Sequence, residues 1–278
     1  MAGLETTATY DETTQTFTID SPTIKAAKFW PGSLGQGANY AVVFARCISL
    51  GNDYGPMPFI VQIRDIETHE PLPGITVGDL GTKVGYNSVD NGFLMFAKVK
   101  VPRKALLARF TEINEDGSFE VKGDLRVLYT VMSKIRLQLT RQSAFFLLKQ
   151  AKAAVRYAVC RRQFANYKDS KLERKLLDYQ VHLEVLARNL ATSIILSMAG
   201  FEMNQLHTES ADFKHLEILH HLTSGVKALA TEAVYAGLDE MRQSCGGAGF
   251  LLSSGVASWW AEAAPMPTFE GVNVVMFQ

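Results

Sequence analysis

The chain has 278 residues, of which 47% are hydrophobic and 20% charged, and its 28 basic residues balance its 28 acidic ones. A chain of this length can bury a substantial core and is expected to form about two domains. Its apolar and aromatic content excludes a disordered or fibrous protein, and the zero net charge argues against a general nucleic-acid binder. The charge is unevenly distributed, because residues 126–175 hold 13 basic and 2 acidic side chains. This segment favours an anionic ligand.

The cysteines, the apolar runs and the chain ends predict a soluble intracellular protein. Cys47, Cys160 and Cys245 are odd in number and far apart, which indicates neither a disulfide framework nor a metal site. The longest apolar run, about 190–201, is shorter than the roughly 20 residues that a membrane span needs. The first ten residues have no signal-peptide pattern, and the last four carry no peroxisomal address.

Short runs of β-type residues, separated by turns that contain Gly or Pro, occupy the first part of the chain. The runs lie at 16–19, 41–44, 59–63 and 93–101. No helix-length periodic segment lies between them, so βαβ units are not expected. The pattern predicts an antiparallel β-sandwich or barrel domain over residues 1–125.

Helical periodicity begins after Asp124, and no proline follows until Pro265. The predicted helices cover about 128–164, 173–207 and 212–244, and Asp212 is the expected N-cap of the third. Long helices of this kind pack as an antiparallel bundle. Residues 272–277 have the pattern of a fourth helix that is cut short. We therefore predict an α+β fold whose second domain, at 126–278, is an incomplete four-helix-type bundle.

Two motifs at helix ends could contact a phosphate-bearing ligand. Gly246 and Gly247 follow the third helix, and bare backbone N–H groups there suit phosphate or adenine. A helix cap with a tight turn is the commoner use of such glycines. Arg161 and Arg162 close the first helix in the cationic segment. They could bind a pyrophosphate or cap the helix, and composition leaves both possibilities open.

Trp30 and Glu270 are two further candidates. Trp30 precedes Gly32 in a loop, where an aromatic ring beside an unhindered backbone suits stacking on a flat ring system. A buried Trp beside a turn is the simpler explanation. Glu270 lies in an apolar neighbourhood at a predicted helix start, a setting that suits a general base, although a Glu there more commonly complements the helix dipole. No metal-ligand spacing, G-x-S-x-G elbow or Walker loop occurs in the sequence.

In their order along the chain, these motifs resemble those of the acyl-CoA oxidases, which are flavin-dependent enzymes of the acyl-CoA dehydrogenase superfamily. The resemblance covers nearly the whole chain. It rests on the segments 3–11, 28–32, 71–79, 90–92, 157–164, 245–250 and 268–271. The segments 71–79 and 90–92 resemble the oxidase branch more than the dehydrogenase branch.

This resemblance implies FAD as the cofactor and Glu270 as the catalytic base. The cofactor-binding residues that it implies are Trp30, Gly32, Arg161, Gln243, Gly246 and Gly247. The first two would face the flavin, Arg161 would meet the pyrophosphate, and the last three would lie on the adenine side. In the superfamily the adenine-side contacts usually come from a neighbouring subunit, so the resemblance also implies a homodimer.

The implied reaction is the oxidation of an acyl-CoA in fatty-acid β-oxidation, with the peroxisome as the implied location. Glu270 would remove an α-proton while a hydride leaves the β-carbon for the flavin. Molecular oxygen would then reoxidise the flavin, so the products would be trans-2-enoyl-CoA and hydrogen peroxide.

The chain departs from the family in several places. Around Asn273, the family usually has an acidic residue and Thr where this chain has Val272 and Val274, and Ala248 replaces the usual oxidase His. The family also has N-terminal and C-terminal domains that this sequence does not contain. Two alternatives therefore stand beside the oxidase hypothesis. One is an acyl-CoA dehydrogenase that uses an electron-transfer flavoprotein, and the other is a truncated, non-catalytic fragment that acts as a structural or dimerisation partner.

Overall fold

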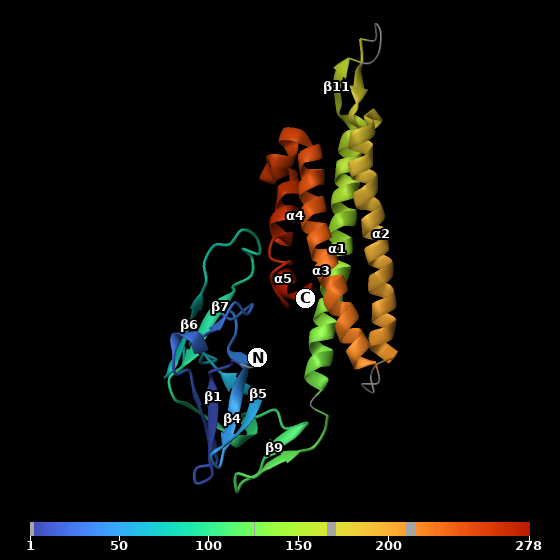
Figure 1. The fold of residues 1–278 in the computed structure, drawn as a ribbon. Coiled ribbons are helices and arrows are strands. Elements are labelled where there is room, and N and C mark those ends of the chain that lie inside the picture. The colour runs from blue at the N-terminus through green and yellow to red at the C-terminus, as the bar shows by residue number, and fades with distance from the viewer. Residues whose placement is uncertain (1–2, 125, 166–170, 210–214) are drawn as a thin grey trace. The chain divides into compact units, whose positions relative to one another are not determined.

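The computed structural model describes residues 3–124, 126–165, 171–209 and 215–278. The chain divides into two compact units, Met1–Lys83 with Asn87–Leu125, and Val84–Tyr86 with Arg126–Gln278. The first unit is built of strands and the second mainly of helices (Figure 1). The predicted α+β fold class is therefore confirmed.

Most strands of the first unit, here called the β unit, form two sheets. The five-stranded sheet has the order β5 (Asn52–Gln62), β4 (Tyr40–Ser49), β1 (Thr7–Asp11), β2 (Thr16–Asp20) and β8 (Val99–Pro102). The three-stranded sheet has the order β3 (Lys28–Phe29), β7 (Gly92–Phe96) and β6 (Ile75–Asp79). A small ribbon pairs β9 (Thr111–Ile113) with β10 (Phe119–Val121). The strand order of each sheet is linear, so the sandwich and not the barrel describes this unit.

One strand pair departs from the predicted antiparallel arrangement. Strands β1 and β4 are parallel, with Thr7 opposite Arg46 and Thr9 opposite Ile48. Strands β1 and β2 are joined by a short turn and must be antiparallel, whereas β4 reaches β1 only after the long connection 21–39. A long connection permits parallel pairing, which a tight turn cannot.

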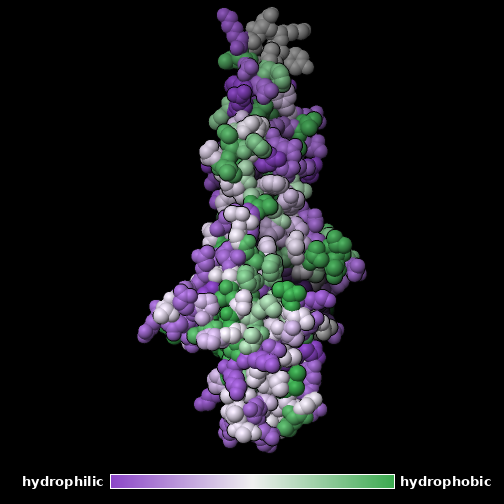
Figure 2. All heavy atoms as spheres, turned by 90° about the vertical axis from the view of Figure 1, so that its left-hand side faces the viewer, coloured by the Kyte–Doolittle hydropathy of each residue, from purple (hydrophilic) through white to green (hydrophobic). Residues whose placement is uncertain are grey.

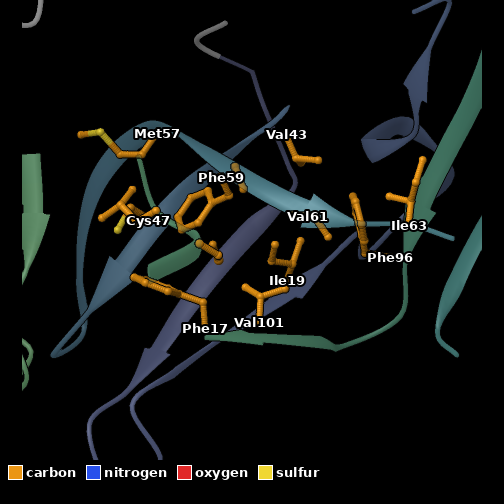
Figure 3. Packing of buried hydrophobic residues seen from close by; sticks show 14 of the residues in the cluster. Phe17, Ile19, Val43, Cys47, Met57, Phe59, Val61, Ile63, Phe96 and Val101 are labelled. Atoms are coloured by element: carbon orange, nitrogen blue, oxygen red, sulfur yellow. The ribbon is translucent and has the colours of Figure 1, made fainter. Parts of the chain in front are cut away.

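The core of the β unit lies between its two sheets. Alternate residues of each strand point inward, as the two-residue period of a strand requires. Phe17 of β2 packs edge-on against Phe59 of β5, with ring centroids 5.0 Å apart. Leu94 and Phe96 of the three-stranded sheet belong to the same buried cluster. Figure 3 shows Phe17, Phe59 and Phe96 among the packed residues of this cluster.

The second unit, here called the helical unit, contains three long helices and two short ones. They are α1 (Val127–Cys160), α2 (Gln180–Glu209), α3 (Leu216–Ser244), α4 (Val256–Ala263) and α5 (Asn273–Met276). The three long helices run in alternating directions, and α1 packs against both α2 and α3 (Figure 1). Buried residues of α1 such as Leu147, Ala151, Ala154 and Ala158 recur every three or four positions, which is the stripe that a packed helix buries.

Several predicted helix boundaries are wrong, and one predicted N-cap cannot be placed. Helix α1 ends at Cys160 and not at Phe164, because Arg162–Ala165 forms strand β11, which pairs with β12 (Glu173–Lys175). Helix α2 accordingly begins at Gln180. Asp212 lies outside the described residues. Helix α4 was not predicted, since it is only eight residues long, and α5 agrees with the predicted start of a fourth helix.

Hydrophobic and hydrophilic residues are interspersed on the molecular face that Figure 2 shows. Among the helices of the described residues, none combines the length and the hydropathy that crossing a bilayer requires.

Candidate functional site

Trp30 and Gly32 lie in the loop that follows β3 in the β unit. Trp30 has a left-handed backbone (φ 92°), and its side chain is 43% exposed, so it is not a core residue. Its N–H donates to the Gly92 carbonyl (2.9 Å), and its carbonyl accepts a hydrogen bond from Asn91 Nδ2 (2.7 Å). Gly32 is also exposed. The loop therefore presents an aromatic ring and an exposed glycine at the surface of the β unit, and a side chain on Gly32 would begin 3.3 Å from Val89 Cγ1.

Two charged side chains hold the continuation of this loop. The buried guanidinium of Arg64 donates to the carbonyls of Ala38 and Gly35, both at 2.7 Å. The carboxylate of Asp90 accepts two loop N–H groups at 2.8 and 2.6 Å, and these bonds lower the pKa of Asp90. Because both anchors contact backbone groups, they fix the path of the loop whatever its side chains are. Neither Arg64 nor Asp90 stands out in the sequence as a residue of this kind.

Arg161 is the C-terminal cap residue of α1. Its backbone has turned to an extended conformation, and its N–H still donates to the Tyr157 carbonyl (2.8 Å). Its side chain is exposed. The neighbouring Arg162 instead binds the Glu173 carbonyl through Nη1 (2.8 Å), which ties β11 to β12. Of the two arginines, Arg161 is thus the one whose side chain is available to a ligand.

Gln243, Gly246 and Gly247 lie where α3 ends and a 3-10 turn, Gly246–Phe250, begins. Gly246 has a left-handed backbone (φ 57°), and no atom stands within 4 Å of where a side chain on Gly246 or Gly247 would begin. Gly249 differs, since a methyl group there would overlap the Arg242 carbonyl oxygen. One part of the glycine segment is thus required by packing, whereas Gly247 is open and exposed.

Glu270 lies in the turn between α4 and α5, residues 265–271, here called the Glu270 turn. Two N–H groups of the turn donate to the Pro265 carbonyl, at 2.9 and 3.1 Å. Glu270 is half-buried and has a left-handed backbone (φ 58°), and Gly271 follows with φ 108°. Glycine adopts this region readily, but a glutamate there is strained and needs support from its surroundings.

Two buried cations contact the backbone of the Glu270 turn. Arg136 of α1 is 6% exposed and donates through Nε to the Glu270 carbonyl (3.2 Å). Lys227 of α3 is 0% exposed and donates to the Gly271 carbonyl (2.7 Å). Burial lowers the pKa of both side chains, that of Lys227 to about 8, while the charge of Glu270 opposes both shifts. The neighbourhood of Glu270 is therefore cationic and not simply apolar, contrary to the expectation.

A signal for Lys227 was present in the sequence. It stands on the same helical stripe as Leu219, Thr223, Ala230 and Val234, all of which are buried. A lysine at such a position is unusual, because charged side chains are rarely buried without partners. Its partners are separated from it by more than 40 residues, so the stripe alone does not identify them.

The predicted residues fall into separate groups. Trp30 and Gly32 belong to the β unit, and the other five belong to the helical unit. Within the described helical residues, no hydrogen bond joins Arg161 to Gln243 or to the glycine turn. The structure instead brings Glu270 together with Arg136 and Lys227, which the sequence analysis did not single out.

Comparison with known proteins agrees with the sequence resemblance. Residues 129–278, more than half of the chain, match the family described as acyl-CoA oxidase, C-alpha1 domain. The chain is 40% identical to peroxisomal acyl-coenzyme A oxidase 1 of Rattus norvegicus, over 99% of its own length and 42% of that protein. It is also 40% identical to the Arabidopsis thaliana protein of that name, of which it covers 43%. The chain thus spans less than half of these relatives.

Solved structures show the same similarity. Arabidopsis thaliana acyl-CoA oxidase 1 superposes with a TM-score of 0.94 at 40% identity, over 99% of this chain and 43% of that one. Acyl-CoA oxidase-2 of Caenorhabditis elegans, bound with FAD, ascaroside-CoA and ATP, gives 0.94 at 38% identity, over 99% of this chain and 42% of that one. The chain belongs to the acyl-CoA oxidase family.

Proposed function

We propose that this chain is part of an acyl-CoA oxidase, which converts an acyl-CoA and molecular oxygen to trans-2-enoyl-CoA and hydrogen peroxide. The observation that carries the proposal is the Glu270 turn, where a strained glutamate is held by two buried cations in a chain of this family. Strain that the surroundings maintain at one carboxylate is typical of a functional residue.

In the proposed reaction the Glu270 carboxylate takes the α-proton of the acyl-CoA. Arg136 and Lys227 hold the backbone carbonyls of Glu270 and Gly271, so the turn that carries the proposed base is fixed before the substrate binds. When bound, FAD supplies the acceptor for the hydride that leaves the β-carbon, and oxygen returns it to the oxidised state.

The surface residues of this chain fit FAD. The exposed guanidinium of Arg161 suits a pyrophosphate, and the exposed ring of Trp30 suits an isoalloxazine face. Gly246 and Gly247 offer open backbone on which an adenine or phosphate can lie. We therefore assign these residues, with Gly32 and Gln243, to the cofactor.

A homodimer accompanies this assignment. Arg161 lies at the end of α1, whereas Gln243 and the glycine turn lie at the end of α3, so the two groups can contact cofactors of different subunits. Four apolar residues of α2 support a protein interface, because they are exposed in the chain by itself. They are Ile194, Ile195, Met198 and Phe201. A peroxisomal location is proposed from the names of the relatives.

The test is a peroxide assay on the purified chain incubated with FAD and acyl-CoAs of several lengths. Glu270→Gln should lower turnover about 10²–10⁴-fold, the usual contribution of a general base, and should leave the flavin absorbance at about 450 nm unchanged. Glu184→Gln on the exposed face of α2 is the matched control. If Glu270→Gln forms peroxide as fast as the parent, Glu270 is not the base. If electrons pass to an electron-transfer flavoprotein and not to oxygen, the chain is a dehydrogenase.

A further inference from the structure

Lys227 is a fully buried lysine whose ammonium group donates to the Glu270 turn and to the first residue of α5. Its Nζ donates to the Gly271 carbonyl (2.7 Å) and to Asn273 Oδ1 (2.9 Å). A buried ammonium group destabilises a protein unless good acceptors surround it. The hydrogen bonds of Lys227 to Gly271 and Asn273 therefore explain why a lysine occupies this core position, which an apolar side chain could fill.

The two acceptors lie immediately after Glu270. Gly271 is the next residue, and Asn273 begins α5. Arg136 binds the carbonyl of Glu270 itself, so cations from α1 and α3 hold two consecutive carbonyl groups. Both residues whose carbonyls are held have left-handed backbones. This arrangement fixes the one stretch of the turn that a free chain would not adopt.

Asn273 extends the contact from the backbone to α3. Its side chain is 2% exposed, and its Nδ2 donates to Thr231 Oγ1 (2.9 Å) and to Glu232 Oε1 (2.9 Å). The charged groups that act on Lys227 are Arg136 from α1, Glu232 from α3 and Glu270 from the turn. Lys227 and Asn273 thus form a single polar connection between the middle of α3 and the start of α5.

We propose that Lys227, acting through Gly271 and Asn273, is a positioning residue that sets the direction of the Glu270 carboxylate toward the α-carbon of the acyl-CoA. This inference rests on the proposed function for its catalytic consequence. Its structural part, that Lys227 holds the Glu270 turn, does not depend on turnover. The two parts are therefore tested by different measurements on the same variants.

The first measurement is amide hydrogen exchange of the full chain without added cofactor. Lys227→Met should accelerate exchange about tenfold or more in residues 273–277, where the N–H groups of 273 and 275–277 are bonded within the turn and α5, and should leave the middle of α2 unchanged. Lys134→Met, the same substitution at an exposed site of α1, should change neither. Asn273→Ala is the second variant and should act in the same direction. Unchanged exchange in 273–277 overturns the proposal, with or without turnover.

The second measurement separates positioning from stability. With FAD and an acyl-CoA deuterated at its α-carbon, Lys227→Met should lower kcat per bound flavin about tenfold or more and increase the primary isotope effect. KM should change by less than about twofold. A merely structural lysine would lower the amount of folded protein and leave kcat per flavin and the isotope effect unchanged, which would overturn the positioning role. Lack of turnover in the parent chain counts against the proposed function, while the exchange measurement still decides whether Lys227 holds the turn.

Discussion

At the scale of single residues, the helical unit places its most unusual chemistry around Glu270. Arg136 and Lys227 are buried and charged, and each binds a carbonyl of the Glu270 turn. Each cation also has a second partner, Ser224 for Arg136 and Asn273 for Lys227. Burial of a charge lowers the free energy of unfolding unless hydrogen bonds to the charged group compensate, so these two cations lower the stability of the protein if any of their bonds is lost.

The cost of burying Lys227 should appear in the pH dependence of stability. The pKa of Lys227 is lowered to about 8 in the folded protein, against 10.5 ordinarily, so the unfolded state binds more protons between these values. Stability should therefore rise with pH in this window, by at most about 1.4 kcal/mol per pH unit, and be lost again as the pH falls toward 8. Urea unfolding at several pH values gives the free energy of unfolding of the parent and of Lys227→Met, and the contribution of Lys227 is the difference between the two.

The difference between the two proteins is needed because Lys28, whose pKa burial also lowers to about 8, titrates in both. If the difference in the free energy of unfolding between the two proteins stays constant from pH 8 to pH 10, burial does not lower the pKa of Lys227.

At the scale of elements, the glycine turn after α3 separates a packing role from a binding role. Gly249 is buried against the Arg242 carbonyl, whereas Gly247 is exposed and has open space around it. Both interpretations offered for this motif, a tight turn and a ligand contact, can therefore hold at different glycines of one segment.

Alanine at Gly249 should lower stability, whereas alanine at Gly247 should weaken FAD binding without lowering stability. Gly249→Ala should lower the free energy of unfolding by about 1–3 kcal/mol, because its methyl group cannot be accommodated. Gly247→Ala should change it by less than about 0.5 kcal/mol and should weaken FAD binding, which flavin fluorescence titration measures. If Gly247→Ala binds FAD as the parent does, Gly247 is not an adenine-side contact.

The elements also show how far the sequence was informative. The long helices were predictable because their apolar residues recur locally, as in the stripe from Leu147 to Ala158. The end of α1 was not, since residues 162–164 continue the helical pattern and leave it only by pairing with β12. The parallel pairing of β1 with β4 joins residues far apart in the sequence, which local patterns do not show. Family resemblance named Glu270 as a candidate, but the convergence of Arg136 and Lys227 on its turn depends on tertiary packing.

At the scale of the whole molecule, the chain contains two separate hydrophobic cores. One lies between the sheets of the β unit and includes Phe17 and Phe59, and the other lies among the helices and includes Leu147 and Leu238. We propose that residues 1–125 and 126–278 are domains that unfold as separate cooperative units. The relatives extend well beyond both, since this chain covers less than half of their length.

A core substitution in one unit should then leave the other unaffected. Phe59→Ala should destabilise the β unit by about 3–5 kcal/mol, whereas Ile60→Ala on the exposed face of the same strand should have a small effect. Native-state hydrogen exchange should show faster exchange in β4 and β5 and unchanged exchange in α1 and α3. Equal loss of protection in both units would show that they unfold as one.

The three cysteines differ in reactivity in a way that has a practical use. Cys160, the last residue of α1, is exposed, whereas Cys47 and Cys245 are buried and burial raises the pKa of both, that of Cys47 to about 12. Since the thiolate is the reactive form, a maleimide dye should attach to the native protein at Cys160 alone. The dye would lie beside Arg161, where its fluorescence would report the binding of a phosphate-bearing ligand. Cys47 and Cys245 would react only when the β unit or the helical unit, respectively, unfolds.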